Sequence, residues 1–129
     1  MSTERRLFST NSPWEPVVGY SRAVRIGSFI AVSGTTATNE QGELVAIGDP
    51  YGQTVQVLKN IQAAVEKAGG SLEAIFRTRI YVTDIGQWEA IGRAHGEFFG
   101  KIRPATAMVE VSALIQPNML VEIEADAML

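Results

Sequence analysis

The stretch from Arg103 to Ala127 reads RPATAMVEVSALIQPNMLVEIEADA, and its pattern decides the fold class. Apolar and polar residues alternate in segments 107–111 and 121–127, which flank the break Gln116–Asn118. Alternation with a period of two predicts two strands, because successive side chains of a strand point to opposite faces. One face of each strand is therefore expected to lie against the core. The opposite face of the second strand is unusually acidic and carries Glu122, Glu124 and Asp126.

Composition limits the size of the fold and its chemistry. With 129 residues, of which 46% are hydrophobic and 19% charged, the chain is expected to form one globular domain over residues 1–129. The sequence has no cysteine and one histidine, His95. Disulfides, thiolate nucleophiles and an imidazole metal cluster built by one chain are therefore excluded, which leaves only a carboxylate-rich or symmetry-shared metal site.

Charge and hydropathy narrow the choice of partners and compartment. The formal net charge of -3 weighs against a nucleic-acid binder that works through a broad basic surface. No window of about 18 apolar residues predicts a transmembrane helix, and the first residues lack the apolar run of a secretory signal. We therefore expect a cytoplasmic protein without a membrane partner.

The rest of the chain predicts strands at 7–10, 23–26, 29–34 and 75–82, with a loop at 11–16 held extended by two prolines. Asp49 and Pro50 open a helix that Gly69 and Gly70 end. Asp84 and Gln87 are spaced as a capping box for a second helix. One face of this helix is expected to carry Trp88, Ile91, His95 and Phe98. The order of these strands and helices along the chain predicts an α+β fold, with a single mixed sheet and two helices packed on one of its faces.

The other face of this sheet is expected to be charged. It would carry Arg77 and Arg79 beside the acidic residues of the last strand, together with Tyr81 and Met108; Val109 is expected on the core face. Charge pairing between neighbouring strands explains this pattern. A polar subunit interface explains it as well, and we favour the interface because long strands and open faces are usually covered by partners.

Few residues stand out as chemical groups. The helical spacing of His95 favours packing at the edge of the core over a role as general base. Glu122 and Glu124 lie on one strand face, roughly 7 Å apart, which suits either a surface ion pair or a divided acid and base pair. Gly34 ends an apolar strand, where a backbone bend is the usual reason and close approach of a ligand the other.

Short segments in one order along nearly the whole chain carry a family resemblance. They are GYSRAV at 19–24, VSG at 32–34, the helix at 53–70, YVTD at 81–84, FF at 98–99, RPA at 103–105 and VEIEA at 121–125. Together they resemble the reactive intermediate deaminase family, the Rid or YjgF-type proteins. The resemblance implies a chorismate-mutase-like fold and a homotrimer whose sheets line a central barrel. It also implies small-molecule clefts between adjacent subunits.

The same resemblance implies an activity and a set of site residues. Deaminating members hydrolyse imines and enamines released by pyridoxal-phosphate enzymes to a keto acid and ammonia, and no cofactor or metal is implied. In these members a glutamate of the last strand holds the attacking water. The resemblance implies that Glu122 is this catalytic residue here. Backbone groups at the Ser-Gly strand end and a tyrosine shape the cleft, so Ser33, Gly34 and Tyr20 are expected to contact the substrate.

The sequence departs from the family pattern at the substrate anchor. Thr106 follows Pro104 and Ala105 where deaminating members have an arginine that grips the substrate carboxylate. A hydrogen bond to a charged group contributes about 1.5 to 3 kcal/mol, so binding of a 2-imino acid should weaken. Arg103 and Thr106 are the candidates for contacting the substrate instead, with a surface or interface charge as the alternative for Arg103. Met108 and Gly92 replace the cysteine and asparagine found in some members.

Three hypotheses follow. The first is an imine or enamine deaminase with altered substrate choice. The second is a family relative without that activity, which binds a small, uncharged metabolite or hydrolyses another bond. The third, an endoribonuclease or translation inhibitor, is disfavoured by the acidic net charge and the absence of a basic, aromatic stripe.

Overall fold

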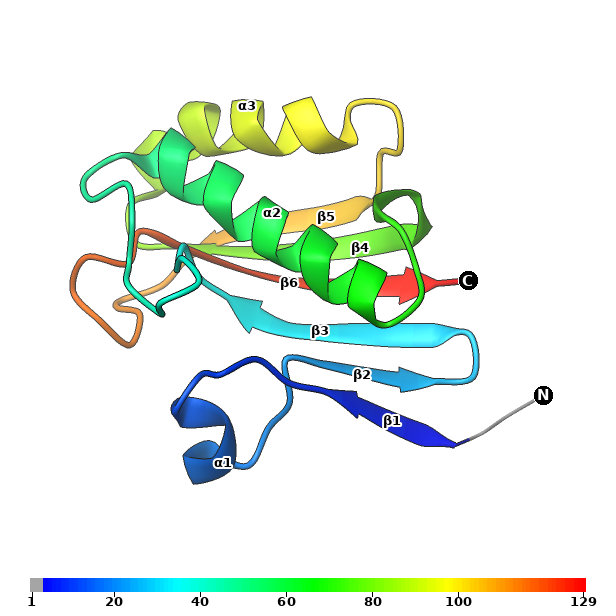
Figure 1. The fold of residues 1–129 in the computed structure, drawn as a ribbon. Helices are drawn as coiled ribbons and strands as arrows, with labels where there is room; N and C mark the ends of the chain where they lie inside the picture. Colours follow the sequence, from blue (N-terminus) through cyan, green and yellow to red (C-terminus); the bar gives the residue numbers. More distant parts are fainter. Residues whose placement is uncertain (1–3) are drawn as a thin grey trace.

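The computed structural model describes residues 4–129 and contains one six-stranded sheet (Figure 1). The strand order is β1-β2-β3-β6-β4-β5, and every neighbouring pair is antiparallel except β4 and β5, which are parallel. The expected mixed sheet of an α+β fold is therefore confirmed. Its strands are β1 (Arg5–Phe8), β2 (Ala23–Ile26), β3 (Phe29–Thr35), β4 (Ile75–Val82), β5 (Ala105–Glu110) and β6 (Val121–Met128).

Two long helices, α2 (Pro50–Lys67) and α3 (Trp88–Phe99), cover the same face of the sheet (Figure 1). The Asp49 carboxylate caps α2 by accepting a hydrogen bond from the Gly52 N–H at 3.0 Å. Beyond the helix, Gly69 adopts a φ of 98°, a conformation that favours glycine. Both boundaries agree with the sequence pattern. No helix within residues 4–129 has the length and apolar character needed to span a membrane.

Two local predictions are wrong. Segment 11–16 is not extended, because a short helix, α1 (Trp14–Val18), begins within it. Pro13 adopts helical angles before this helix, and Pro16 lies in its first turn, where a missing N–H costs nothing. The Asp84 carboxylate caps a separate 3-10 turn, η2 (Ile85–Gln87), by accepting from Gly86 N–H at 2.9 Å. As a result α3 starts one turn later, and Trp88 is 54% exposed.

The core lies between the sheet and the two long helices. α2 contributes Val57, Leu58, Ile61 and Val65, and α3 contributes Ile91 and Phe99. The sheet contributes fully buried residues at alternating positions of β6, as its pattern predicts: Val121, Ile123, Ala125 and Ala127.

Strand β5 directs toward the core the set of side chains that was expected on the open face. Met108 pairs with the buried Ile80 and packs against the core, whereas Val109 pairs with Tyr81 on the open face and is 46% exposed. The register against β4 sets these faces, and alternation within β5 alone does not reveal which apolar residues are inside. Met108 therefore does not belong to the charged face.

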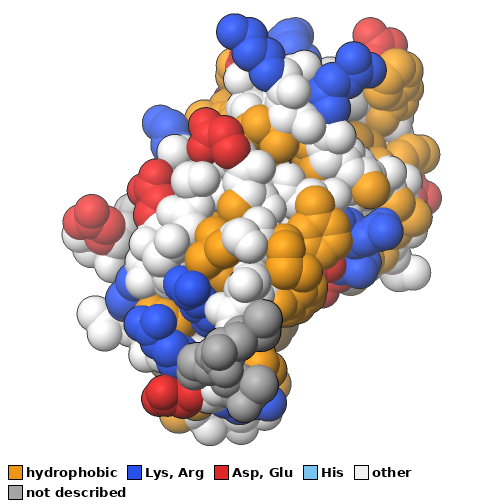
Figure 2. All heavy atoms as spheres, turned by 90° about the vertical axis from the view of Figure 1, so that its right-hand side faces the viewer, with side chains coloured by type: hydrophobic (Ala, Val, Ile, Leu, Met, Phe, Trp, Pro, Cys, Tyr) orange, Lys and Arg blue, Asp and Glu red, His pale blue; other side chains and the backbone are white. Residues whose placement is uncertain are grey.

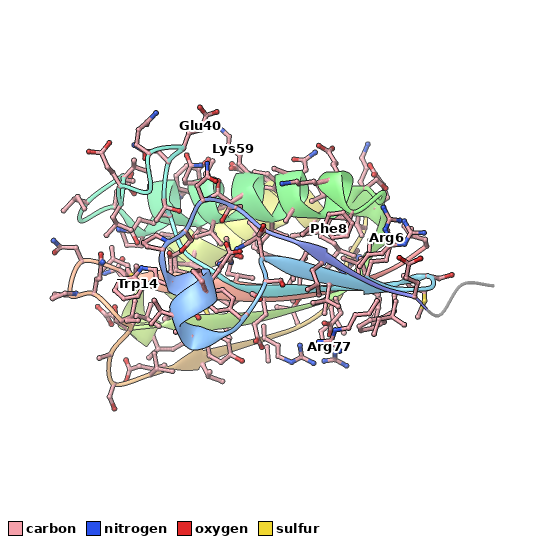
Figure 3. The ribbon with its side chains drawn as sticks, turned by 60° about the horizontal axis from the view of Figure 1, so that its bottom comes forward. Arg6, Phe8, Trp14, Glu40, Lys59 and Arg77 are labelled. Atoms are coloured by element: carbon pink, nitrogen blue, oxygen red, sulfur yellow. The ribbon has the colours of Figure 1, made fainter. Side chains whose placement is uncertain are left out.

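The open face carries the charge pairs that the strand pattern predicts. Arg79 lies 3.1 Å from Asp126 and 3.8 Å from Glu124, and the Tyr81 hydroxyl donates to Glu124 at 2.7 Å. Arg77 projects from the side of the sheet away from α2 (Figure 3). Each of these groups is only half-buried, so the pairs contribute little to stability on their own. Burial of this face by another subunit stays a prediction.

The start of β6 is fixed by a fully buried glutamine of α2. The Gln53 side-chain amide donates to the Asn118 carbonyl at 2.9 Å, and its oxygen accepts from the Leu120 N–H at 2.9 Å. Both backbone groups belong to the loop that leads directly into Val121 and Glu122. Position 53 therefore links α2 to the strand that carries Glu122.

Replacing Gln53 by leucine should leave the Asn118 carbonyl and the Leu120 N–H unpaired. Asn118 is exposed and Leu120 half-buried, so loss of the two hydrogen bonds, each contributing about 0.5 to 1.5 kcal/mol, should lower the free energy of unfolding in urea by about 1 to 3 kcal/mol. The control is Gln62→Leu, which changes a half-exposed glutamine of the same helix. Equal stability of the two variants would contradict this role for Gln53.

Candidate functional site

The site is built around an irregularity in β3. Val32 pairs with Ala125 and Thr35 pairs with Ile123, so Ser33 and Gly34 together face a single residue of β6. This is a β-bulge, which interrupts the ladder of backbone hydrogen bonds and re-aims the neighbouring side chains. The Ser-Gly strand end that the sequence analysis singled out is therefore a bent segment of backbone.

Arg22 holds the bulge in place. Its Nη1 donates to the Gly34 carbonyl at 2.8 Å and to the Thr35 hydroxyl at 2.9 Å, with a longer contact of 3.5 Å to the Ser33 carbonyl. The Ser33 hydroxyl donates to the Ser21 carbonyl at 2.6 Å. A charged donor thus replaces hydrogen bonds that a regular ladder would supply.

Tyr20 is brought to the bulge by α1. The N–H groups of Gly19 and Tyr20 both donate to the Glu15 carbonyl, at 2.9 and 3.0 Å, and Gly19 turns the chain with a φ of 89°. The Tyr20 ring centroid lies 5.6 Å from the Arg22 guanidinium carbon, and Nη2 of Arg22 lies 3.4 Å from the Tyr20 hydroxyl. Helix α1, which the sequence did not predict, therefore positions a predicted site residue.

Glu122, at the start of β6, packs directly against Gly34. A Cβ at position 34 would collide with Oε2 of Glu122, so a side chain there would force the Glu122 carboxylate to move from its present position. The carboxylate is half-buried and, within residues 4–129, makes no hydrogen bond and no ion pair. We call Tyr20, Arg22, Ser33, Gly34 and Glu122 the bulge site.

The electrostatics of the bulge site raise the pKa of Glu122. Loss of solvent raises the pKa of Glu122 above its usual value, the charge of Arg22 lowers it, and the charge of Glu124 raises it. The net direction is upward. A half-buried carboxylate with a raised pKa and no partner is a candidate for accepting and returning a proton.

Thr106 lies away from the bulge site. It is on the helix-covered side of β5, where its hydroxyl is 2.7 Å from the Thr78 hydroxyl, which in turn is 2.9 Å from Nε2 of His95. Glu122 is on the open side of the sheet, beside Tyr81. One chain therefore does not bring Thr106 and Glu122 together.

His95 packs as its helical spacing predicts. Its ring lies 4.6 Å from the Phe99 ring, and burial lowers the pKa of the imidazole. Its Nε2 is engaged with Thr78 under α3. The imidazole is therefore part of the packing on the helix side and takes no part in the bulge site.

Arg103 lies at the opposite end of the sheet from Glu122, just before β5. Its φ of 57° is unusual for a residue with a side chain, and its N–H donates to the Phe99 carbonyl at 2.8 Å, which ends the turn after α3. Arg103 lines an open groove of about 580 Å³ with Glu73, Phe76 and Met128. Figure 2 shows hydrophobic side chains gathered at this end of the molecule.

The structure thus unites four of the predicted residues, Tyr20, Ser33, Gly34 and Glu122, and separates them from Arg103 and Thr106. Sequence reasoning missed Arg22, although it lies inside the GYSRAV segment. Among residues 4–129, no group of three or more His, Asp or Glu side chains is placed to hold a metal ion.

Comparisons with known proteins identify a matching family and several similar proteins. The sequence model of a family described as "Endoribonuclease L-PSP" matches residues 10–129. The crystal structure of Rv2704 from Mycobacterium tuberculosis, described as a member of the YjgF/YER057c/UK114 family, is 49% identical with a TM-score of 0.89, covering 98% of this chain and all of that one. A RutC family protein of Pyrococcus horikoshii is 36% identical over 94% of each chain. The 3-aminoacrylate deaminase RutC of Acinetobacter baylyi is 33% identical over 84% of this chain and 85% of its own.

The charges around Glu122 predict how it titrates. Arg22→Gln should raise the pKa of Glu122, because it removes a positive charge, and Glu124→Gln should lower it, because it removes a negative one. Carbon-detected NMR of the Glu122 carboxyl group during a pH titration measures both shifts. Glu40→Gln, which changes an exposed loop residue, should leave this pKa unchanged. Shifts of the same sign in Arg22→Gln and Glu124→Gln would contradict the opposite effects assigned to Arg22 and Glu124 on the pKa of Glu122.

Proposed function

Because this chain belongs to the Rid family of YjgF-type proteins, we propose that it hydrolyses small imines or enamines, with Glu122 as the residue that activates water. The observation that carries the proposal is the unpaired, half-buried Glu122 carboxylate against a backbone carbon without a side chain. The relative named 3-aminoacrylate deaminase acts on an enamine, which supports this class of substrate.

The chemistry needs one group that moves a proton in both directions. Glu122 removes a proton from water as the water oxygen attacks the carbon of a protonated C=N group, and a carbinolamine forms. Glu122 then gives the proton to the amine nitrogen. The C–N bond breaks with its electron pair on nitrogen, and the hydroxyl proton passes to the departing ammonia, which leaves a carbonyl compound and ammonium. A raised pKa suits Glu122 to this exchange, because it lies closer to working pH than that of an ordinary carboxyl group.

We further propose that the complete site lies between two subunits of a homotrimer. The residues expected to contact the substrate form two groups in one chain, the bulge site on the open side and Thr106 on the helix side of the outer strand β5. Approach of the β5 edge of a second chain would bring the two groups together. Solvent-exposed apolar residues on the open face, among them Phe29, Phe76 and Val109, support its burial by a neighbour.

A second candidate is a family relative that binds a small, uncharged metabolite without deaminating it. The observation that favours it is Thr106, whose hydroxyl is already engaged with Thr78 and carries no charge. RNA cleavage, the activity in the name of the family model, is less favoured. The single histidine packs beside Phe99 on the helix side, so no imidazole stands beside Glu122.

The deaminase proposal predicts a measurable acceleration. In an assay where a pyridoxal-phosphate lyase releases 2-iminobutanoate or 2-iminopropanoate, the protein should speed formation of the keto acid. Glu122→Ala should lower this acceleration by about 100-fold or more, because proton transfer by a positioned group contributes 10²–10⁴-fold. Glu40→Ala, which removes an exposed carboxylate on a loop of the helix side, is the matched control (Figure 3).

Thr106→Arg separates the two candidates in the same assay. If the deaminase proposal is correct, this variant should keep the activity and lower the KM for 2-imino acids, because it adds a charge-assisted pair of hydrogen bonds. Activity that appears only in Thr106→Arg would favour the second candidate. No activity in either protein would contradict deamination altogether.

The trimer proposal predicts a charge-sensitive assembly. The protein should sediment at three times its chain mass of 14.0 kDa. Glu124→Lys should dissociate or weaken the assembly, because it reverses a charge within the paired face of β4 and β6. Glu40→Lys makes the same change on an exposed loop and should sediment as the unaltered protein does. Identical sedimentation of all three proteins would contradict burial of the open face.

A further inference from the structure

The bulge site contains a cation whose hydrogen-bonding capacity is only partly used. A guanidinium carries five N–H donors. Nη1 of Arg22 is occupied by the Gly34 carbonyl and the Thr35 hydroxyl, at 2.8 and 2.9 Å. These contacts fix the plane and position of the guanidinium on the backbone of β3. The group is thereby held rigidly, with little side-chain entropy left to lose on binding.

The other edge of the same guanidinium is open. Within residues 4–129, Nε of Arg22 makes no hydrogen bond, and Nη2 has only the long contact of 3.4 Å with the Tyr20 hydroxyl. The N–H groups of Nε and Nη2 point in parallel along this edge. Such a pair matches the two oxygens of a carboxylate and binds them with two charge-assisted hydrogen bonds.

Arg22 and Glu122 both contact Gly34 without forming an ion pair with each other. Arg22 is near enough for its charge to lower the pKa of Glu122, yet no nitrogen of Arg22 lies within 4.0 Å of the Glu122 carboxylate. Both side chains are half-buried, so water screens their charges less than it would at an open surface. Gly34 adds no side chain to the space beside Glu122.

The other candidates for a substrate anchor lie elsewhere. Arg103 is at the far end of the sheet, in the groove beside Phe76. Thr106 is uncharged and bonded to Thr78. Arg79 is paired with Asp126. Of these arginines, only Arg22 acts electrostatically on Glu122.

We propose that Arg22 determines the specificity of the bulge site by binding the carboxylate of a 2-imino acid through Nε and Nη2, beside the water that Glu122 holds. This inference rests on the proposed function. In a 2-imino acid the carboxylate is bonded directly to the carbon that water attacks, so its anchor must stand next to the catalytic carboxylate. Arg22 has that position, and the substrate class is small acids with a C=N group beside the carboxylate.

The test measures binding of two stable probes that differ only in charge. The probes are 2-oxobutanoate, the product of the proposed reaction, and its uncharged analogue 2-oxobutanamide, with dissociation constants measured by NMR titration. The variants are Arg22→Gln and the control Arg93→Gln, which changes an exposed arginine on the outer surface of α3. Each makes the same change of charge and size.

Arg22→Gln should weaken binding of 2-oxobutanoate by about 10- to 100-fold, the effect expected for loss of charge-assisted hydrogen bonds. Binding of 2-oxobutanamide should change by less than about threefold, as should binding of both probes to Arg93→Gln. Equal weakening of both probes by Arg22→Gln would show that Arg22 only holds the bulge, and would overturn the proposal. Unchanged binding of 2-oxobutanoate, or failure of the unaltered protein to bind it, would also overturn it.

Two precautions keep the outcome clear. If Arg22→Gln does not fold, Arg22→Lys replaces it. This variant keeps the charge and loses the parallel pair of donors, so it should still weaken 2-oxobutanoate more than 2-oxobutanamide. Binding of the product requires no hydrolysis. A protein that binds 2-oxobutanoate through Arg22 and does not accelerate imine hydrolysis would therefore contradict the proposed function and support this inference.

Discussion

The slip of register between β3 and β6 is the constraint on which the site depends. Two residues of β3, Ser33 and Gly34, occupy the space opposite one residue of β6, so the backbone bends where Glu122 begins the neighbouring strand. A bulge is stable only if its carbonyl groups find donors, and Arg22 supplies them from the segment that enters β2. The bent backbone in turn brings the α-carbon of Gly34 against the Glu122 carboxylate. The bent backbone, the half-buried Arg22 guanidinium and the candidate catalytic residue Glu122 are thus parts of one arrangement.

The helix-covered face of the sheet forms the core, and the open face carries the candidate chemical groups. On the helix side, α2 and α3 bury the alternate apolar residues of β6, and even the polar Thr78 is satisfied by Thr106 and His95. On the open side, β6 displays three carboxylates in a row, and they differ in environment. Arg79 pairs with Asp126 and Tyr81 bonds Glu124, whereas Glu122 has neither kind of partner within the described residues. The unpaired one is Glu122, beside the bulge, where loss of solvent raises its pKa.

Much of this arrangement was predictable, and the misses share a cause. Alternation in β6 identified its buried residues, and Asp49 and Gly69 marked the ends of α2, because these signals are local. The burial of β5 was assigned wrongly because an edge strand takes its faces from its neighbour: pairing with Ile80 turned Met108 inward and left Val109 outside. Helix α1 was missed because Pro13 and Pro16 suggested an extended loop, although both are compatible with a first helical turn. Arg22 was missed for a different reason, since its importance lies in carbonyl groups of a distant strand that no local pattern displays.

The position of the anchoring charge also determines what assembly contributes to the proposed reaction. The arginine that the family resemblance implies after the Pro-Ala pair would stand on β5. Under the proposed trimer, it would reach a substrate beside Glu122 of the neighbouring chain only after assembly. Here the cation and Glu122 belong to one chain and are fixed by the same bulge. In the proposed trimer the second chain would have no charge to supply from position 106, and its β5 edge would serve to exclude water and to shape the pocket around the substrate side chain. Exclusion of water would strengthen both the Arg22 contact and the effect on Glu122. The proposed assembly would therefore raise the proposed activity through the local dielectric, and not by supplying a charge.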